Sequence, residues 1–286
     1  MRNVRIEKAE KLGLCFGVRR AVKLLKGAAA RYGEIETLGP VAHNRLLVET
    51  LASLGVRPVS HLNQARGKIL AITTHGTSPA ILSEIKARHI RIIDTTCPIV
   101  RKAQNAAREL AEAGFDVVIF GDAEHSEVKG LLGWAGDKGI AALDARQIRK
   151  RRRSPSRLGV ISQTTQIQSA FIKFGLQLMA MVGPKADEIR IINTLCKVTQ
   201  DQQEAAANLA RQSQLMIVIG GTNSANTRHL VEMCSLLTET HSIETADEVD
   251  ITWLAGKLRI GVTAGASTPD ESVEELIDKL RSLVSE

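Results

Sequence analysis

Three cysteines stand at matching places along the chain, and this feature constrains the fold more than any other. Each follows a short apolar run and precedes a helical pattern: Cys15, Cys97 and Cys196. A polar residue stands 28 positions after each of them, and these residues are His43, His125 and Ser224. The shared interval predicts a threefold structural repeat.

The last two copies of this repeat align residue by residue. Residues 92–97 match residues 191–196, and a glutamine, several alanines and a leucine then coincide between 104–111 and 203–210. The first copy shares only the cysteine and the change of hydrophobic period that follows it. The repeat is therefore clearest in the second and third parts of the chain.

The segments after the cysteines predict how each copy folds. Alanine- and leucine-rich stretches predict helices at Val18–Arg31, Ala103–Ala113 and Gln203–Gln212, and β-prone runs follow at 117–120 and 216–219. Parallel strands need such a crossover, so we expect each cysteine and its polar partner at the carboxyl ends of neighbouring strands. Open parallel sheets bind their ligands at that edge.

Each copy contains a further polar position after an apolar strand. Small polar residues follow these strands at Thr73–Gly76, Ser162–Thr165 and Thr263–Ser267. The sequence therefore predicts an α/β protein of three similar small domains with parallel sheets, each presenting a cysteine and two polar tips at one edge. Their expected bounds are 1–95, 96–192 and 193–286, within the usual size range of domains.

Composition narrows the classes of function. Aromatic residues make up 3% of the 286 residues, which favours aliphatic cores and leaves few surfaces for stacking bases. The chain has neither an apolar run near 18 residues nor a charged-then-apolar leader, so we expect a cytoplasmic protein without a membrane partner. Much of the net charge of +7 is local, in the run Arg149–Arg153. We interpret this run as a solvated loop, with docking of an acidic partner or contact with RNA as the alternatives, and nucleic acid as an unlikely partner.

The three cysteines suggest a shared inorganic centre. Three thiolates suit a cubic [4Fe–4S] cluster, and three protein ligands leave one iron open. The alternatives are separate buried cysteines and a zinc site, although structural zinc sites use local Cys-x-x-Cys pairs that this sequence lacks. Cys234 lies in a helical stretch at no repeat position, and we expect it in a core.

Three histidines and one glutamate occupy positions suited to chemistry. His43, His75 and His125 stand at the polar junctions, whereas the other four histidines do not. Glu127 follows two residues after His125, where burial beside a cluster would raise its pKa and make it a proton donor. The alternative for Glu127 is an ordinary acidic residue at a helix N-terminus.

Two segments of small residues predict an anion site. Gly220–Thr227 and Gly265–Pro269 each join a strand to a helix, and helix N-termini with hydroxyls bind phosphate. Serine and asparagine in such places also serve as plain N-caps. The sequence has no glycine-rich fingerprint of dinucleotide-binding or P-loop proteins.

Taken together, these motifs resemble the LytB family of 4-hydroxy-3-methylbut-2-enyl diphosphate reductases over nearly the whole length. The resemblance rests on nine ordered segments: Gly13–Val18, Val41–Arg45, Thr74–Gly76, Asp94–Pro98, His125–Val128, Ser162–Thr165, Asn193–Cys196, Asn223–Thr227 and Gly261–Ser267. It implies a pseudo-threefold, trefoil-like fold around a central [4Fe–4S] cluster, held by Cys15, Cys97 and Cys196.

The resemblance also implies roles for individual residues. Catalytic roles fall on Glu127, Thr164 and His125, and substrate contacts on His43, His75, His125, Thr164, Thr165, Ser224, Ala225, Asn226 and Ser267. Ala225 stands where many members have a second serine, which puts one phosphate hydrogen bond in doubt.

The implied reaction removes the hydroxyl of the allylic diphosphate substrate as water. It uses two electrons and two protons and gives isopentenyl and dimethylallyl diphosphates, with ferredoxin or flavodoxin as the expected electron donor.

Two other functions remain open at this point. Quinolinate synthase also has three repeated domains with one cluster cysteine in each, although His125-Ser126-Glu127 and the Asn223–Thr227 run favour the reductase. A non-catalytic iron–sulfur or nucleic-acid-binding protein is the second alternative, and the basic run motivates it.

Overall fold

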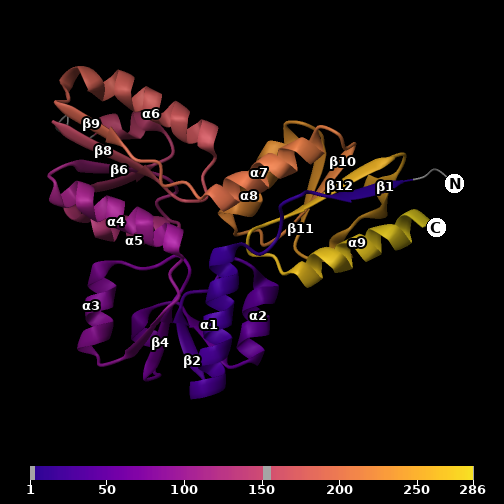
Figure 1. Cartoon of the computed structure of the whole chain (residues 1–286), viewed down its shortest axis with the longest axis horizontal. Coiled ribbons are helices and arrows are strands. Elements are labelled where there is room, and N and C mark those ends of the chain that lie inside the picture. Colours follow the sequence, from indigo (N-terminus) through magenta and orange to yellow (C-terminus); the bar gives the residue numbers. More distant parts are fainter. Residues whose placement is uncertain (1–3, 151–155, 286) are drawn as a thin grey trace. The chain divides into compact units, whose positions relative to one another are not determined.

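The computed structural model describes residues 4–150 and 156–285. Within these residues the chain forms three parallel sheets of four strands each, with helices packed against them (Figure 1). The predicted α/β class is confirmed. The described residues divide into two compact units: 4–19, 42–53 and 197–285 form unit 1, and 20–41, 54–150 and 156–196 form unit 2.

Unit 1 contains one sheet. Its strands lie in the order β1 (Arg5–Lys8), β12 (Arg259–Ala264), β10 (Leu215–Ile219) and β11 (Glu239–Ile243). In Figure 1 the indigo β1 lies beside β12, because the first described strand pairs with the last one. The helices of this unit are α2 (Arg45–Ser53), α7 (Lys197–Ala210), α8 (Ala225–Ser235) and α9 (Asp270–Ser285).

Both faces of this sheet are covered by helices. Alternate residues of a strand point to opposite faces, so Leu215 and Ile217 of β10 pack toward α9 while Met216 and Val218 pack toward α7 and α8. Burial on both faces explains the uninterrupted apolar run of β10. Cys234 is fully buried in the core with Met216 and Val218, as expected.

Unit 2 contains the other two sheets that the described residues form. The first has the order β3 (Val56–Val59), β2 (Ile35–Leu38), β4 (Ile69–Ile72) and β5 (Arg91–Asp94), and the second β7 (Gly139–Ala142), β6 (Asp116–Phe120), β8 (Arg157–Ser162) and β9 (Glu188–Ile191). Most of α1 (Phe16–Tyr32) belongs to this unit, together with α3 (Pro79–Ala87), α4 (Pro98–Glu112), α5 (Ser126–Ala135) and α6 (Gln168–Val182). Helices α4 and α5 share one core with the β6–β8 sheet, and α6 shares another.

The three sheets repeat one topology. Read from the edge strand, their orders are β5-β4-β2-β3, β9-β8-β6-β7 and β1-β12-β10-β11. In each sheet the edge strand leads to a cysteine, and the next two strands lead to polar residues. These sets are Cys97 with His75 and His43, Cys196 with Thr164 and His125, and Cys15 with Ser267 and Ser224. Each sheet therefore presents a cysteine and two polar tips, as predicted.

The expectation that a cysteine and the residue 28 positions later follow neighbouring strands is wrong. Cys97 follows β5 and His125 follows β6, and these two strands belong to different sheets. The helix after each cysteine therefore connects two sheets and is not a crossover within one.

The first described strand also lies in a different sheet from the one expected. Residues 5–8, which we expected in the first domain, pair with β12 in the sheet of the third. The expected boundaries after residues 95 and 192 fall just beyond β5 and β9, and they stay predictions.

One backbone hydrogen bond recurs at all three cysteines. The amide of Cys97 donates to the carbonyl of Thr74 at 3.0 Å, that of Cys196 to Thr164 at 2.8 Å, and that of Cys15 to Ala266 at 2.9 Å. Each acceptor lies in the loop after the strand that neighbours the edge strand of its cysteine. The repeat thus fixes all three cysteines at equivalent positions, immediately before a helix.

Among the described helices, none is long and apolar enough to cross a membrane.

Candidate active site

A buried carboxyl group lies at the centre of the polar residues of unit 2. Glu127 in the first turn of α5 is 2% exposed. Its Oε1 accepts a hydrogen bond from the backbone amide of Thr164 at 2.7 Å, and its Oε2 accepts one from Thr164 Oγ1 at 2.8 Å. The two residues meet because β6 and β8 are adjacent strands, paired at Phe120 and Ser162.

Burial controls the protonation of Glu127. It raises the pKa of this carboxyl from 4.5 to about 7, although the two hydrogen bonds from Thr164 act in the opposite direction. A carboxyl group with this pKa is populated in both protonation states at neutral pH, which is what a general acid requires.

His125 and His75 lie close together in unit 2. His125 caps α5, and its Nδ1 accepts a hydrogen bond from the amide of Glu127 at 3.2 Å. A neutral His125 ring therefore carries its proton on Nε2. The His75 ring meets the His125 ring edge-on, with centroids 5.5 Å apart. The carboxyl ends of the two sheets of unit 2 thus contribute to one polar region.

Two of the three repeat cysteines belong to this unit. Burial raises the pKa of the Cys97 thiol, the amides of Ile99 and Val100 lower it, and the charges of Cys196 and Glu127 raise it further. Charges act on a buried thiol only from nearby, so Cys196 and Glu127 lie in the same region as Cys97. Thiols are the ligands preferred by iron–sulfur clusters, so this donor set fits two of the three ligands that the sequence predicts.

Thr165 follows Thr164 at the same strand end. It is half-buried, and its Oγ1 accepts a hydrogen bond from the side-chain amide of Gln163 at 3.2 Å. It therefore lies beside the Glu127–Thr164 pair but is held by a different neighbour.

Unit 1 contributes a helix N-terminus with buried polar groups. Ser224 caps α8, and its Oγ accepts a hydrogen bond from the amide of Thr227 at 3.3 Å. Asn226 and Ser267 are 3% and 5% exposed. Within the described residues, neither the amide atoms of Asn226 nor the hydroxyl of Ser267 has a hydrogen-bond partner. Such groups cost roughly 1–3 kcal/mol each when unpaired, and an anion at the helix N-terminus would accept hydrogen bonds from Asn226 Nδ2 and Ser267 Oγ.

Two glycines allow this region to close around the helix. A side chain at Gly221 would place its Cβ 2.1 Å from the carbonyl oxygen of His43, and one at Gly265 would lie 2.2 Å from Thr227 Oγ1. Their specific role was not predicted, because a glycine in a sequence does not show which backbone approaches it.

His43 and Ala225 complete the set in unit 1. Burial lowers the pKa of His43, and the nearby Arg228 lowers it further, so its ring is neutral at pH 7. Ala225 is buried at the first position of α8 and offers its backbone but no hydroxyl.

The structure therefore distributes the predicted site residues over the two units. Unit 1 holds Cys15, His43, Ser224, Ala225, Asn226 and Ser267, and unit 2 holds His75, Cys97, His125, Glu127, Thr164, Thr165 and Cys196. Of the histidines predicted to have no functional role, His241 stacks on Trp253 with centroids 3.9 Å apart.

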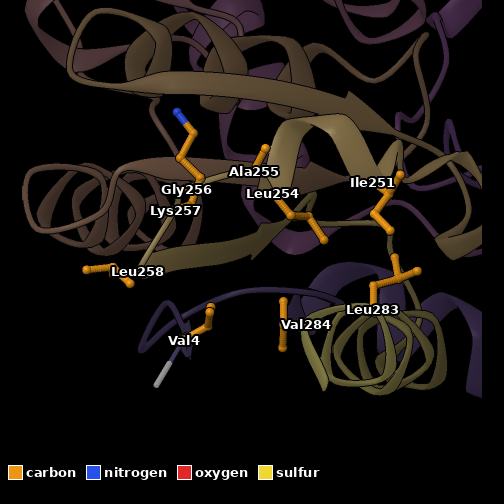
Figure 2. A pocket seen from close by; sticks show the side chains of 9 residues that line it. All are labelled: Val4, Ile251, Leu254, Ala255, Gly256, Lys257, Leu258, Leu283 and Val284. Carbon is orange, nitrogen blue, oxygen red and sulfur yellow. The ribbon is translucent and has the colours of Figure 1, made fainter. Parts of the chain in front are cut away.

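A pocket in unit 1 is lined mostly by residues with apolar side chains. Figure 2 shows its lining, which includes Val4, Leu254, Lys257 and Leu283. None of the predicted site residues lines it.

Three equivalent parallel sheets define an α/β protein whose cysteines, buried acid and polar helix N-terminus all lie after the carboxyl ends of strands. Residues 6–281 match the LytB protein family. The chain belongs to this family.

Two similar proteins carry the same name. The 4-hydroxy-3-methylbut-2-enyl diphosphate reductase of Dehalococcoides mccartyi strain CBDB1 is 45% identical, over 98% of this chain and 99% of that protein. The protein of the same name from Geobacter metallireducens is 38% identical, over 97% of each chain.

Solved structures agree with this relationship. The structure of (E)-4-hydroxy-3-methyl-but-2-enyl diphosphate reductase, the terminal enzyme of the non-mevalonate pathway, matches with a TM-score of 0.71 and 35% identity, over 99% of this chain and 100% of that one. The corresponding Plasmodium falciparum reductase gives a TM-score of 0.91 over 96% of this chain and 87% of that one. At 24% identity it shows the fold alone.

Proposed function

We propose that this chain is an oxidoreductase that converts 4-hydroxy-3-methylbut-2-enyl diphosphate into isopentenyl and dimethylallyl diphosphates, the last step of the non-mevalonate isoprenoid pathway. The relatives are named for this activity. Within the chain, the observation that carries the proposal is the buried Glu127–Thr164 pair, which supplies an acid with a pKa of about 7 in the same unit as two cysteines.

The diphosphate end of the substrate needs hydrogen-bond donors and a positive electrostatic potential. The N-terminus of α8 supplies the potential, and Ser224, Asn226 and Ser267 supply polar groups. His43, His75, His125 and Thr165 complete the set proposed to contact the substrate, together with the backbone of Ala225. Binding energy from this anchor would orient the reacting allylic end.

Glu127 and Thr164 would transfer protons to the substrate. The reaction breaks the bond between carbon and the hydroxyl oxygen, consumes two electrons and two protons, and releases one water. One proton leaves with the hydroxyl and the other joins the allyl carbon. The Thr164 hydroxyl bonds directly to Glu127, so it can hold the substrate hydroxyl and pass a proton to it, with His125 positioning the amide of Glu127.

The proposed cofactor is a [4Fe–4S] cluster held by Cys15, Cys97 and Cys196. Support comes from the identical backbone hydrogen bond at each cysteine and from the equivalent place of each after an edge strand. When bound, such a cluster supplies electrons one at a time. A ferredoxin or flavodoxin would provide them, and a cytoplasmic location suits thiols that must remain reduced.

Anaerobic purification with iron and sulfide analysis tests the cofactor, and turnover with reduced methyl viologen tests the activity. We expect Cys97→Ser to lose most of its iron, whereas Cys234→Ala, a matched control in the core of unit 1, retains it. Unchanged iron in Cys97→Ser would contradict the ligand assignment.

A substrate comparison separates the reductase from its nearest rival. Activity with dihydroxyacetone phosphate and iminoaspartate, combined with none on the allylic diphosphate, would indicate a quinolinate synthase and refute the proposal.

A further inference from the structure

The outer face of α6 carries an exposed row of apolar side chains. Phe171, Phe174 and Leu178 enter the core of the β6–β8 sheet. Ile172, Leu176 and Met179 lie on the opposite face at helical spacing and are 54%, 62% and 47% exposed.

A strand residue extends this row. Ile191 at the end of β9 is 43% exposed, and its Cδ1 lies 3.4 Å from the position of a Cβ on Gly175 of α6. The lack of a side chain at Gly175 lets Ile191 lie against the helix. We call Ile172, Leu176, Met179 and Ile191 the α6 patch. Contiguous exposed apolar side chains of this kind mark interaction surfaces, whereas scattered single ones do not.

The surplus positive charge of the chain lies in the same segment. Residues 143–192 contain ten basic and three acidic residues, a net charge of +7 that equals the charge of the whole chain. The remaining residues hold 28 basic and 28 acidic side chains and are neutral together.

Two lysines of this segment lie on or next to α6. Lys173 on α6 and Lys185 just after it are exposed. The 3-10 helix Ala145–Lys150 packs Ile148 into the core that α6 covers, and it ends within the basic run Arg149–Arg153. Residues 151–153 of that run lie outside the described residues.

The positive charge of residues 143–192 indicates which kind of partner fits the α6 patch. A second copy would bring the same positive segment against itself, which is unfavourable across a symmetric interface. Single-stranded nucleic acid binds by stacking its bases on aromatic side chains, which the aliphatic patch lacks, and a duplex binds by its phosphates and gains nothing from an apolar row. An acidic protein with an apolar centre satisfies both the patch and its surroundings.

The patch is also connected to the thiols. The chain runs from Ile191 to Cys196 in five residues, so their Cα atoms lie within about 18 Å of each other. We propose that the α6 patch is the docking surface for an acidic one-electron carrier protein. This inference rests on the proposed function, because that reaction takes two electrons from outside the chain. Each turnover would oxidise two carriers by one electron each, with two protons taken up and one water released.

A double variant, Lys173→Glu with Leu176→Glu, tests the surface in the holoenzyme. Turnover is measured with a reduced acidic [2Fe–2S] ferredoxin and with reduced methyl viologen, and binding of the oxidised ferredoxin is measured by calorimetry. We expect kcat/KM for ferredoxin and the binding constant each to fall at least tenfold, while the viologen rate stays unchanged. Leu236→Glu is the matched control, since Leu236 is 82% exposed in unit 1, and it should change neither rate.

Salt dependence adds a second measurement. Added salt screens the attraction between the basic segment and an acidic carrier, so the ferredoxin rate of the wild type should fall as salt is added. The fall should be smaller in Lys173→Glu alone, a single exposed change that leaves the apolar row intact.

Each contrary result overturns the inference. An unchanged ferredoxin rate in the double variant, equal losses with both reductants, or an equal loss in Leu236→Glu would do so. Loss of binding to anionic phospholipid vesicles or to RNA, with ferredoxin turnover intact, would assign the surface to those partners. If the wild type shows no viologen turnover, the proposed function fails, while ferredoxin calorimetry still tests the docking surface.

Discussion

The polar residues of the two units are prepared for substrate in opposite ways. In unit 2 both carboxyl oxygens of Glu127 already accept hydrogen bonds from Thr164. In unit 1 the buried amide of Asn226 and hydroxyl of Ser267 have no partner among the described residues. The comparison indicates that the proton-transfer groups are organised before substrate arrives, whereas the anchor is completed by the substrate itself. In unit 1, substrate binding would recover the stability that the unpaired polar groups cost.

The largest effect is expected for Glu127→Gln. Glutamine keeps the size of the side chain and both hydrogen bonds to Thr164, since its carbonyl accepts from the amide and its NH2 group donates to Oγ1. It cannot deliver a proton, so turnover with reduced viologen should fall by roughly 100-fold or more while the substrate dissociation constant changes little. Retained turnover would show that Glu127 is not the acid.

The same variant tests the cost of burying Glu127. Its pKa is 4.5 when unfolded and about 7 when folded, so the unfolded state loses its proton first as the pH rises. Stability should therefore decrease from pH 4.5 to 7 and level off above, by roughly 3 kcal/mol in total. Urea unfolding of wild type and Glu127→Gln at pH 5 and pH 8 measures this. Relative to wild type, Glu127→Gln should be more stable at pH 8 than at pH 5. If the difference in free energy of unfolding between the two proteins were the same at both pH values, the raised pKa of Glu127 would be contradicted.

Gly221→Ala tests the close approach in unit 1. Its Cβ would lie 2.1 Å from the His43 carbonyl oxygen, and a backbone atom cannot move away cheaply. We expect a loss of about 1–3 kcal/mol in the free energy of unfolding, together with weaker substrate binding. The control is Gly27→Ala in α1, where nothing lies within 4 Å of the new Cβ, and which should raise the thermal midpoint slightly. Equal midpoints for the two variants would argue against the contact.

The smallest effects, of opposite sign, are expected at Ser267. Ser267→Ala removes a buried hydroxyl that has no partner in the described structure, so it should stabilise the substrate-free protein by about 1 kcal/mol and weaken substrate binding about tenfold. Ser224→Ala removes a helix cap and should lower both stability and affinity. Calorimetric titration and unfolding of both variants test this, and a destabilised Ser267→Ala would remove the distinction between the units.

The sequence predicts the strands, helices and polar junctions well because these are local properties. It does not predict where the structural repeat begins, since a period is the same whichever residue starts it. The spacing therefore groups Cys97 with His125, although the strand before Cys97 pairs with the strand that leads to His75. The sequence indicates both Glu127 and Thr164, but not their contact, which spans 37 residues and depends on the pairing of β6 with β8. The exposed row on α6 gave no signal, because isoleucine, leucine and methionine suit a buried face equally well.

The pairing of β1 with β12 has a consequence for biosynthesis. Residues 5–8 leave the ribosome before residues 259–264, with which they pair, and the amide of Cys15 donates a hydrogen bond to the carbonyl of Ala266. Cys15 is translated before Cys97 and Cys196, yet it reaches its final position only after residues 259–266 have emerged. Assembly of an inorganic centre that uses Cys15 would then have to wait for those residues, and deletion of β12 would impair a ligand that lies far upstream in the sequence.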